Sequence, residues 1–151
     1  MSEVPPDPKR GLDFGILTGL IGYQLRRAQV AVFDHFAEAF RDLELTPGQL
    51  GALALIQANS GLSQSALGIA LGVDRSTVVP LIDRLEARGL VVRAASPKDR
   101  RSHALQLSAA GGRLLAQAEA RVRAHESAIA QGLSEAERRT LLELLGRIGP
   151  G

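Results

Sequence analysis

Cysteine is absent from this chain of 151 residues, and methionine occurs once, at the first position. The lack of thiols excludes disulfide bonds, zinc sites built on thiolates and nucleophilic cysteine chemistry. It also excludes sensing of peroxides by cysteine, and oxidation of the initiator methionine is not expected to act as a switch. Thiol and methionine redox chemistry is therefore not expected to control this protein.

Aromatic residues are scarce at 3%, whereas 45% of the residues are apolar. The core is therefore expected to consist of leucine, alanine, valine and isoleucine, a mixture that favours helices. No run of about 20 apolar residues is present, so the sequence predicts no membrane span. The N-terminus is acidic and rich in proline and lacks the pattern of a signal peptide, so we expect a cytoplasmic protein.

A net charge of only +2 does not by itself indicate a partner. The length suits one domain with a core of its own. The motifs of serine hydrolases, phosphate-binding loops and zinc proteases are all missing, and the three histidines, His35, His103 and His125, lie far apart in the chain. We therefore expect no enzyme, no metal and no cofactor. A zinc site built from His35, Glu38 and His125 across helices is the less favoured alternative.

The most informative stretch covers residues 62–108 and reads LSQSALGIALGVDRSTVVPLIDRLEARGLVVRAASPKDRRSHALQLS. Ser63 is a favourable N-cap for a helix over 64–71, which a glycine then ends. Asp74 caps a second helix over 75–88, and apolar residues recur at helical spacing in both helices. The stretch therefore predicts two short amphipathic helices that meet at a tight turn.

A basic hairpin is predicted directly after these helices. Residues 90–93 and 104–107 have the pattern of two strands, and between Arg93 and Arg101 four basic residues and one acidic residue give a local charge of +3. This order of parts is that of a winged helix-turn-helix, which places its second helix in the major groove of DNA. Two helices around a glycine turn also occur in many all-α proteins, so the hairpin carries the argument for DNA.

Two segments resemble the MarR-type (multiple antibiotic resistance regulator) winged-helix transcription regulators. They are STVVPLIDRLEARGLVVR over 76–93 and SPKDRRSHALQLSAAG over 96–111. The wing pattern of that family is an aspartate, one residue, an arginine, a leucine-x-leucine strand, and a threonine or serine that opens a long helix. In this chain those places are held by Asp99, Arg101, Leu105, Leu107 and Ser108.

The resemblance implies roles in DNA recognition. In the family the second helix reads the major groove, and the resemblance gives that role to Arg75, Ser76, Thr77 and Val79. A wing arginine, here Arg100 or Arg101, enters the minor groove. Asp83 and Asp99 are expected to support the wing, with Asp83 pairing with a wing arginine. Short hydroxyl and arginine side chains at helix starts can also reach phosphates. The residues expected to contact DNA are Ser63, Gln64, Arg75, Ser76, Thr77, Val79, Arg84, Lys98, Arg100 and Arg101.

Pro80 departs from the family pattern, because members often carry a polar or basic residue there. A proline removes one hydrogen bond from a helix and cannot donate one to a base. Two interpretations remain open. Either Pro80 changes the DNA sequence that is read, or it sits near enough to the helix start to be tolerated.

The fold implied is mainly α with a small β-hairpin wing, a winged helix-turn-helix with N- and C-terminal dimerisation helices. Residues 1–10, which include three prolines, are expected to form a flexible arm. Residues 11–45 and 108–148 form the helical dimerisation region, and 46–107 the DNA-binding region. One long helix is expected over 12–43, either continuous or broken near Gly19 or Gly22. Its surplus of apolar residues suits a homodimer, or alternatively covers the core of its own chain.

The resemblance also implies a small-molecule site. Family members bind phenolic or other aromatic carboxylates, sometimes as thioesters, between the dimer helices and the DNA-reading unit. Aromatic and basic side chains gather on the first helix, and an arginine can hold a carboxylate with two hydrogen bonds. The alternative is that the aromatic residues belong to the core and that the arginines are solvated. The candidate ligand residues are Tyr23, Arg26, Phe33 and His35.

The sequence thus predicts a sequence-specific DNA-binding transcriptional regulator. We expect a homodimeric repressor that binds a near-palindromic operator in double-stranded DNA and is released by a small aromatic acid or thioester. A second class of function stays open, in which the winged helix is a protein-interaction module without specific DNA binding. Salt separates the two, because phosphate contacts weaken steeply with salt whereas an apolar protein interface does not.

Overall fold

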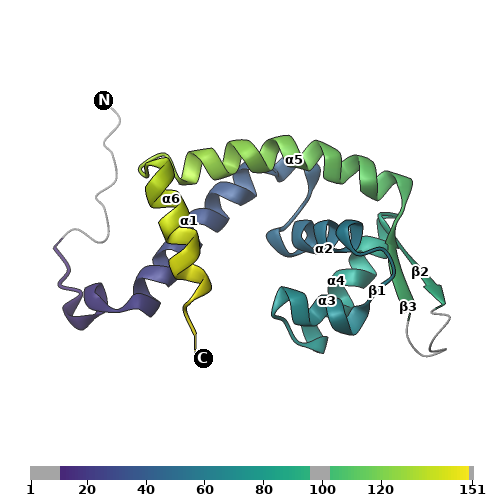
Figure 1. Cartoon of the computed structure of the whole chain (residues 1–151), viewed down its shortest axis with the longest axis horizontal. Helices are drawn as coiled ribbons and strands as arrows, with labels where there is room; N and C mark the ends of the chain where they lie inside the picture. The colour runs from purple at the N-terminus through teal and green to yellow at the C-terminus, as the bar shows by residue number, and fades with distance from the viewer. Residues whose placement is uncertain (1–10, 96–102, 150–151) are drawn as a thin grey trace.

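The computed structural model describes residues 11–95 and 103–149. The predicted flexible arm, residues 1–10, and the four predicted wing-tip residues, Lys98, Asp99, Arg100 and Arg101, lie outside the described residues. Figure 1 shows one long helix, α5, running along the top of the molecule. The sheet and the helices α2, α3 and α4 lie beneath one end of α5, and α6 with the first part of α1 lies near the other end.

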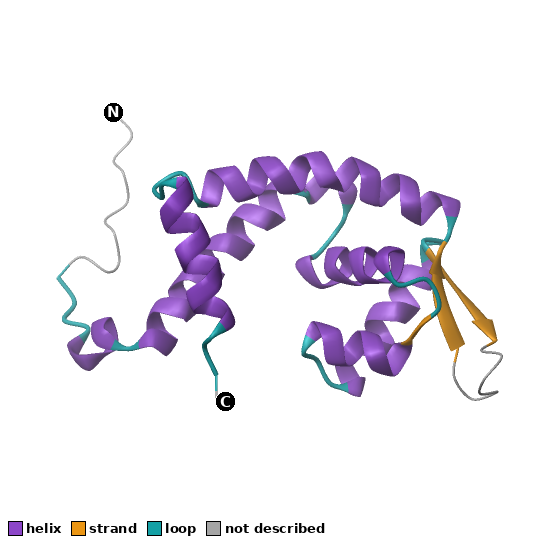
Figure 2. Ribbon diagram, viewed as in Figure 1, coloured by secondary structure: helices purple, strands orange, loops and turns teal. Residues whose placement is uncertain are grey.

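The described chain is mostly helical, with a small antiparallel sheet (Figure 2). The predicted fold class is therefore confirmed. In chain order the elements are η1 (Gly15–Gly19), α1 (Ile21–Ala39), η2 (Arg41–Leu43), α2 (Pro47–Ala58), β1 (Leu62–Ser63), α3 (Gln64–Leu71), α4 (Arg75–Ala87), β2 (Val91–Ala95), β3 (His103–Leu107), α5 (Ala109–Ile129) and α6 (Glu135–Gly146).

Local side-chain chemistry explains where most helices begin. The Ser63, Asp74 and Ser108 side chains each accept a hydrogen bond from a backbone N–H in the first turn of the helix that follows. Thr46 and Ser134 form reciprocal capping boxes with a residue three positions ahead. These contacts satisfy N–H groups that have no partner inside the helix.

The structure divides the predicted first helix at two points, and the first of them, Leu20, lies between Gly19 and Gly22, where the sequence allows a break. Leu20 is extended (φ −94°, ψ 127°) and separates the 3-10 helix η1 from α1. Phe40 ends α1, and η2 follows it as a single short 3-10 helix. The separate turn of η1 starts at Gly15, which has a left-handed backbone (φ 54°) and donates its N–H to the Asp13 carboxylate (2.8 Å).

The sheet contains a strand that the sequence pattern did not predict. Its order is β1-β3-β2, and both pairs of neighbours are antiparallel. Leu62 pairs with Leu105, and Val91 pairs with Leu107. The strand β1 has only two residues, which is too short to show an alternating pattern. It forms because Gly61, at φ 91°, donates its N–H to the Leu105 carbonyl oxygen (3.0 Å) and so aligns the chain with β3.

One apolar core joins the helices α3 and α4 to the sheet and to the middle of the molecule. Its fully buried members come from α2, α3, α4, both long strands and the end of α1: Phe40, Leu53, Ile56, Leu67, Ile82, Leu85, Val91 and Leu105. The helix α5 adds Leu115 and Ala118 to this core. The unit formed by α2, α3, α4 and the sheet, together with its contact with α5, therefore holds most of the buried apolar surface that stabilises the described chain.

The two ends of the described chain contribute no such core. Neither η1 nor α6 has a buried residue. Large apolar side chains instead face solvent on both elements and on the start of α1: Ile16, Leu17, Leu20, Ile21, Leu141, Leu142, Leu144 and Leu145. Within the described ranges no single helix is long and apolar enough to cross a membrane, although α3 and α4, bent by 114°, together reach that length and composition.

The start of α5 lies directly against the turn that follows α4. The Ser108 hydroxyl donates to the Gly89 carbonyl oxygen (2.5 Å), and the Ser108 N–H donates to the Leu90 carbonyl oxygen (3.0 Å). A Cβ atom on Gly111 would overlap that same Leu90 oxygen, whereas a Cβ on Gly112 would meet nothing within 4 Å. Only glycine at position 111 allows α5 to approach the backbone of Leu90 this closely.

The Gly111→Ala variant is therefore expected to lose about 3 kcal/mol or more of unfolding free energy, because backbone must move to admit the methyl group. Gly112→Ala is the matched control. It removes a flexible residue from the same helix without a clash, and it should gain up to about 1 kcal/mol. Urea unfolding followed by circular dichroism measures both changes. Equal effects of the two substitutions would contradict the close approach of α5 to Leu90.

Candidate nucleic-acid interface

The helices α3 and α4 form the predicted helix-turn-helix. The chain bends by 114° between them, within the range of known helix-turn-helix pairs. Gly72 makes the turn in a left-handed conformation (φ 68°). A Cβ on Gly68 would approach the Val73 carbonyl oxygen to 3.3 Å and Val78 to 3.4 Å. A glycine in α3 thus permits the close contact with α4 that fixes the angle of the pair.

One face of α4 is buried, and the opposite face is open. Val78, Ile82 and Leu85 point into the core. Among the predicted DNA contacts on this helix, Val79 is half-buried, and the others are exposed: Arg75, Ser76, Thr77 and Arg84. The first turn of α4 therefore presents a guanidinium and two hydroxyl-bearing residues to solvent.

The N-cap of α4 orders this first turn. Asp74 accepts hydrogen bonds from the Ser76 hydroxyl (2.6 Å) and from the Thr77 N–H (3.1 Å). These bonds, that of Ser76 foremost, lower the pKa of the Asp74 carboxyl below its ordinary value. The Ser76 proton is thereby directed to the cap. The Thr77 side chain also contributes to lowering the pKa of Asp74, and it is exposed, so its hydroxyl lies at the open surface where it can reach a base edge.

Pro80 lies inside α4, as its sixth residue, and it is exposed. Because Pro80 lies beyond the first turn and has no N–H, the helical hydrogen bond to the Ser76 carbonyl oxygen cannot form. The interpretation that Pro80 is tolerated as a helix-start residue is therefore not supported. Its ring stands on the open face of α4 and can offer a base only apolar contact, such as with a thymine methyl group.

Arg93 ties the sheet to both helices. From β2 its guanidinium donates to Asp83 (2.5 Å) and Glu86 (3.1 Å) on α4, and to the Gln64 side-chain oxygen (3.4 Å) on α3. The Arg93 side chain is 24% exposed. Because the planar guanidinium of Arg93 donates to three side chains at once, it restricts the angle between β2 and α4.

The sequence interpretation expected an arginine of the wing as the partner of Asp83. The structure provides Arg93, on the strand itself, and it adds Glu86 and Gln64 to the same network. The sequence pattern indicates Arg93 only as part of a basic run, so this role of Arg93 is not evident from it. Two acidic residues one helical turn apart, followed closely by an arginine within the next strand, are the available signal.

A hollow of about 660 Å³ lies between α3, the start of α4 and the sheet. Three of the predicted DNA contacts, Ser63, Gln64 and Arg75, line it together with Arg93. Ile69 stands at its edge and is 79% exposed. The structure therefore brings both helix starts and the first residues of the wing onto one concave, partly basic surface.

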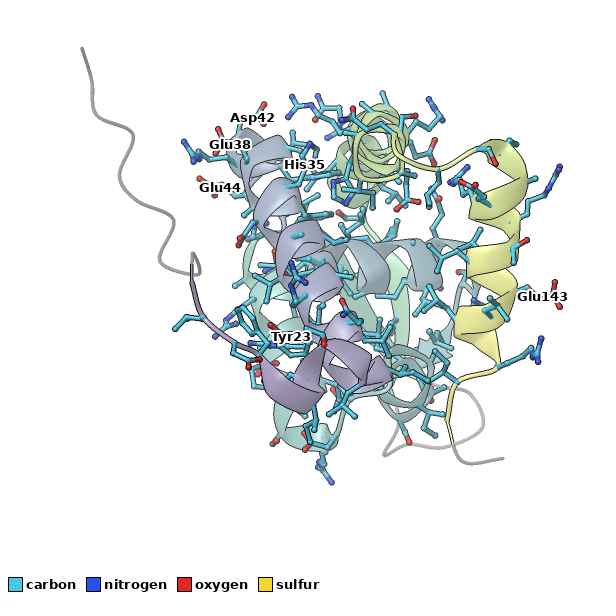
Figure 3. The ribbon with its side chains drawn as sticks, turned by 90° about the vertical axis from the view of Figure 1, so that its left-hand side faces the viewer. Tyr23, His35, Glu38, Asp42, Glu44 and Glu143 are labelled. Atoms are coloured by element: carbon cyan, nitrogen blue, oxygen red, sulfur yellow. The ribbon has the colours of Figure 1, made fainter. Side chains whose placement is uncertain are left out.

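The four candidate ligand residues do not form one cluster. All lie on α1, and Figure 3 shows Tyr23 and His35 toward opposite ends of that helix. At about 100° per residue, Arg26 and Phe33 lie within about 20° of each other, whereas His35 points to the opposite side from Arg26. Tyr23, Arg26 and Phe33 can thus share a face of α1, and His35 cannot.

His35 instead meets His125 of α5. The two Nδ1 atoms are 2.7 Å apart, so one ring donates and the other accepts. His125 is 5% exposed, and its ring packs edge-on against Phe36. Glu38 pairs with Arg41 rather than with the histidines. The described residues contain no group of three histidine, cysteine or acidic side chains placed to hold a metal ion.

A second, smaller hollow of about 320 Å³ lies between α2 and α5. Leu50, Ala54, Leu115 and Val122 give it an apolar floor, and Arg123 lies at its edge. None of the four candidate ligand residues lines it. It was missed in the sequence, because it arises only where the two helices pack.

Burial of His125 makes the stability of the fold depend on pH. Burial first, and the nearby His35 second, lower the pKa of His125 below its ordinary value, and Glu126 opposes them. The neutral ring is favoured in the folded state, so stability falls as the pH drops below about 6.5, the unfolded value, until the folded pKa is reached. Melting temperatures measured from pH 8 to pH 5 should show this loss. It should be smaller in His125→Gln, and an unchanged profile would contradict it.

Comparison with known proteins agrees with this arrangement. A family model described as "MarR family" matches residues 43–102. A relative from Thauera aromatica, "Putative transcriptional regulatory protein for hcr operon", is 44% identical over 135 residues, which cover 89% of this chain and 81% of that protein. The structure of the transcriptional repressor CouR bound to a 23-mer DNA duplex superimposes with a TM-score of 0.85 at 41% identity, covering 90% of this chain and 96% of CouR.

CouR bound to p-coumaroyl-CoA is similar too, with a TM-score of 0.83 and 38% identity over 89% of this chain and 95% of CouR. These matches confirm the family resemblance that was inferred from the wing and the second helix. They also agree with the fold, in which a helix-turn-helix and a small sheet pack beneath one end of the long helix α5. The chain belongs to the MarR family of transcriptional regulators.

Proposed function

We propose that this protein is a homodimeric repressor that binds a near-palindromic operator in double-stranded DNA and leaves it when an aromatic acid or its thioester binds. The observation that carries the proposal is the open first turn of α4, which stands beside the concave surface formed with α3 and the sheet. The likeness to CouR on a DNA duplex supports it. We further propose that the protein acts in the cytoplasm, where its DNA lies, and that it catalyses no reaction.

The residues divide into those that position the protein and those that read bases. We assign Ser63 and Gln64 at the start of α3, with Arg84 on α4, to phosphate contacts, and Arg75 at the start of α4 to the major groove. Thr77 is the first choice for a base contact, because it is exposed in the first turn of α4. Ser76 and Val79 flank it, and Lys98, Arg100 and Arg101 are assigned to the wing tip.

Dimerisation is proposed through residues 11–45 and 108–148. The apolar side chains of η1, of the start of α1 and of α6 are exposed in the single chain, and contiguous apolar surface of this kind marks an interaction site. A two-fold dimer would place two copies of α4 about 34–36 Å apart, one turn of DNA. This symmetry is why the operator is expected to be near-palindromic.

The ligand is proposed to contact the face of α1 that carries Tyr23, Arg26 and Phe33. Phe33 is 48% exposed, and within residues 11–95 and 103–149 the Arg26 guanidinium makes one long hydrogen bond, of 3.5 Å, to the Gln29 side chain. Its guanidinium is therefore free enough to take a carboxylate or a phosphate of a thioester. CouR has been solved with p-coumaroyl-CoA, which supports this chemical class. His35 is assigned to the contact between α1 and α5 instead.

Operator binding is tested by fluorescence anisotropy on the DNA upstream of the gene, over a range of salt. We expect a preference of about a hundredfold or more over a scrambled duplex, with a steep salt slope. Thr77→Ala should change which sequence is preferred. Arg84→Gln should weaken all sequences alike and reduce the salt slope by about one. Equal, weak and salt-insensitive binding would favour a protein-interaction module.

Ligand release is tested with p-coumaroyl-CoA and with p-coumarate on the protein–operator complex. Arg26→Gln should require about tenfold more of the active compound for release, because a charged hydrogen bond is lost. Arg123→Gln is the matched variant, since it removes an arginine beside the hollow between α2 and α5. If Arg123→Gln has the larger effect, the α1 face is not the ligand site. If neither compound releases DNA, the proposed ligand class is wrong.

A further inference from the structure

The segment from Phe40 to Thr46, the α1–α2 linker, is anchored at both ends. Phe40 is fully buried and Leu45 is 5% exposed, so both side chains belong to the core. Between them η2 makes one short turn and ends at Glu44. Glu44 has a φ of 52° and is the only non-glycine residue with a positive φ among the described residues. This backbone conformation is disfavoured for a side chain with a Cβ, so its surroundings must maintain it.

Arg121 of α5 contacts Ala39, at the end of α1, and Asp42 of the linker. Its guanidinium forms a two-point ion pair with the Asp42 carboxylate, with one of the two contacts at 2.6 Å. It also donates to the Ala39 carbonyl oxygen at the end of α1 (3.1 Å). The ion pair lowers the pKa of Asp42 and raises that of Arg121. One side chain of α5 thus holds both the end of α1 and η2.

Arg88 of α4 binds other residues of the same linker. It is the C-cap residue of α4, and its guanidinium donates to the carbonyl oxygens of Glu44 (2.7 Å) and Leu43 (3.2 Å). The left-handed turn at Glu44 leaves these two oxygens outside the helical hydrogen bonds, where one guanidinium can reach both. Figure 3 shows Asp42 and Glu44 together at the end of α1 that lies away from Tyr23.

The two arginines matter more for geometry than for stability. The Arg121 and Asp42 side chains are 39% and 63% exposed, and exposed ion pairs contribute little to the free energy of folding. Each arginine nevertheless joins residues that lie at least 44 positions apart in the chain. The helix α5 packs on α1 and α2, whereas α4 packs on α3, α2 and β2. The linker therefore provides a polar connection from α5 to the end of the reading helix.

We infer that Arg88 and Arg121 are positioning residues that couple α5 to α4 through the α1–α2 linker. A shift of α5 against α1 moves η2 through Arg121, and η2 moves the C-terminal end of α4 through Arg88. The inference rests on the proposed function, because it assigns this route to the transmission of ligand binding to the DNA-reading helix. This route connects α5 with α4, and it lies outside both the residues proposed to contact DNA and the ligand face proposed on α1.

Hydrogen exchange of the free, full-length protein tests the path without DNA or ligand. The amides of Arg88, Gly89 and Leu90 close the last turn of α4 with hydrogen bonds of 2.9 to 3.1 Å and serve as reporters. Arg121→Gln should speed their exchange about threefold or more, although Arg121 lies on α5. Arg113→Gln removes an exposed arginine from the same helix and should leave them unchanged. Unchanged reporters in Arg121→Gln would overturn the inference.

A double-mutant cycle on operator affinity gives the second test. Arg88→Gln and Arg121→Gln should each weaken binding about fivefold, and the pair no more than either alone, instead of about 25-fold for independent sites. Arg121→Lys should restore most of the loss. Asp42→Asn breaks the same ion pair from the linker and should match Arg121→Gln. Additive losses would overturn the path.

The two tests separate the inference from the function on which it rests. If the wild-type protein does not bind its operator, the proposed function fails, whereas the exchange experiment still decides whether α5 and α4 are coupled. Melting temperatures of all variants show whether a substitution unfolds the protein. Should Arg121→Gln unfold, Asp42→Asn provides the same measurement from the other partner.

Discussion

The backbone contact between Leu90 and Gly111 determines where α5 leaves the DNA-reading unit. The Leu90 carbonyl oxygen accepts from Ser108 and leaves no room for a side chain at position 111. A helix of 21 residues starts from this contact, so a small change of angle there becomes a displacement of several ångströms at its far end. The distance between the two reading helices of a dimer depends on that angle, and so does the operator that the dimer fits.

Polar contacts refine what the apolar core cannot specify. The core places α3 and α4 against the sheet, but apolar packing alone is weakly directional. Arg93 adds direction on the wing side by joining β2 to Asp83, Glu86 and Gln64. Arg88, the C-cap residue of α4, adds direction at the same end of the helix by donating to the carbonyl oxygens of Glu44 and Leu43. The C-terminal half of the reading helix is thus fixed by two guanidinium groups, one from the sheet and one directed at the α1–α2 linker.

Much of this fold follows from local chemistry that the sequence displays. The caps at Ser63, Asp74 and Ser108 place helix starts correctly, because their hydrogen bonds stay within one turn. The strand β1 could not be predicted from two residues, since its pairing depends on a partner more than 40 positions away. The Arg93 and Arg88 contacts likewise require the folded chain. The separation of His35 from Arg26 is different, because helical phase alone could have revealed it.

The exposed apolar rows on η1, α1 and α6 have a consequence for how such a regulator exists in a cell. Side chains that find no core within their own chain make order at the two ends a property of the pair rather than of the single molecule. Thermal stability then rises with protein concentration, as mass action requires. Dilution that separates the two chains then also lowers the stability of these ends. Operator DNA that holds two chains together would then stabilise the fold of the dimer as well as keep the promoter repressed.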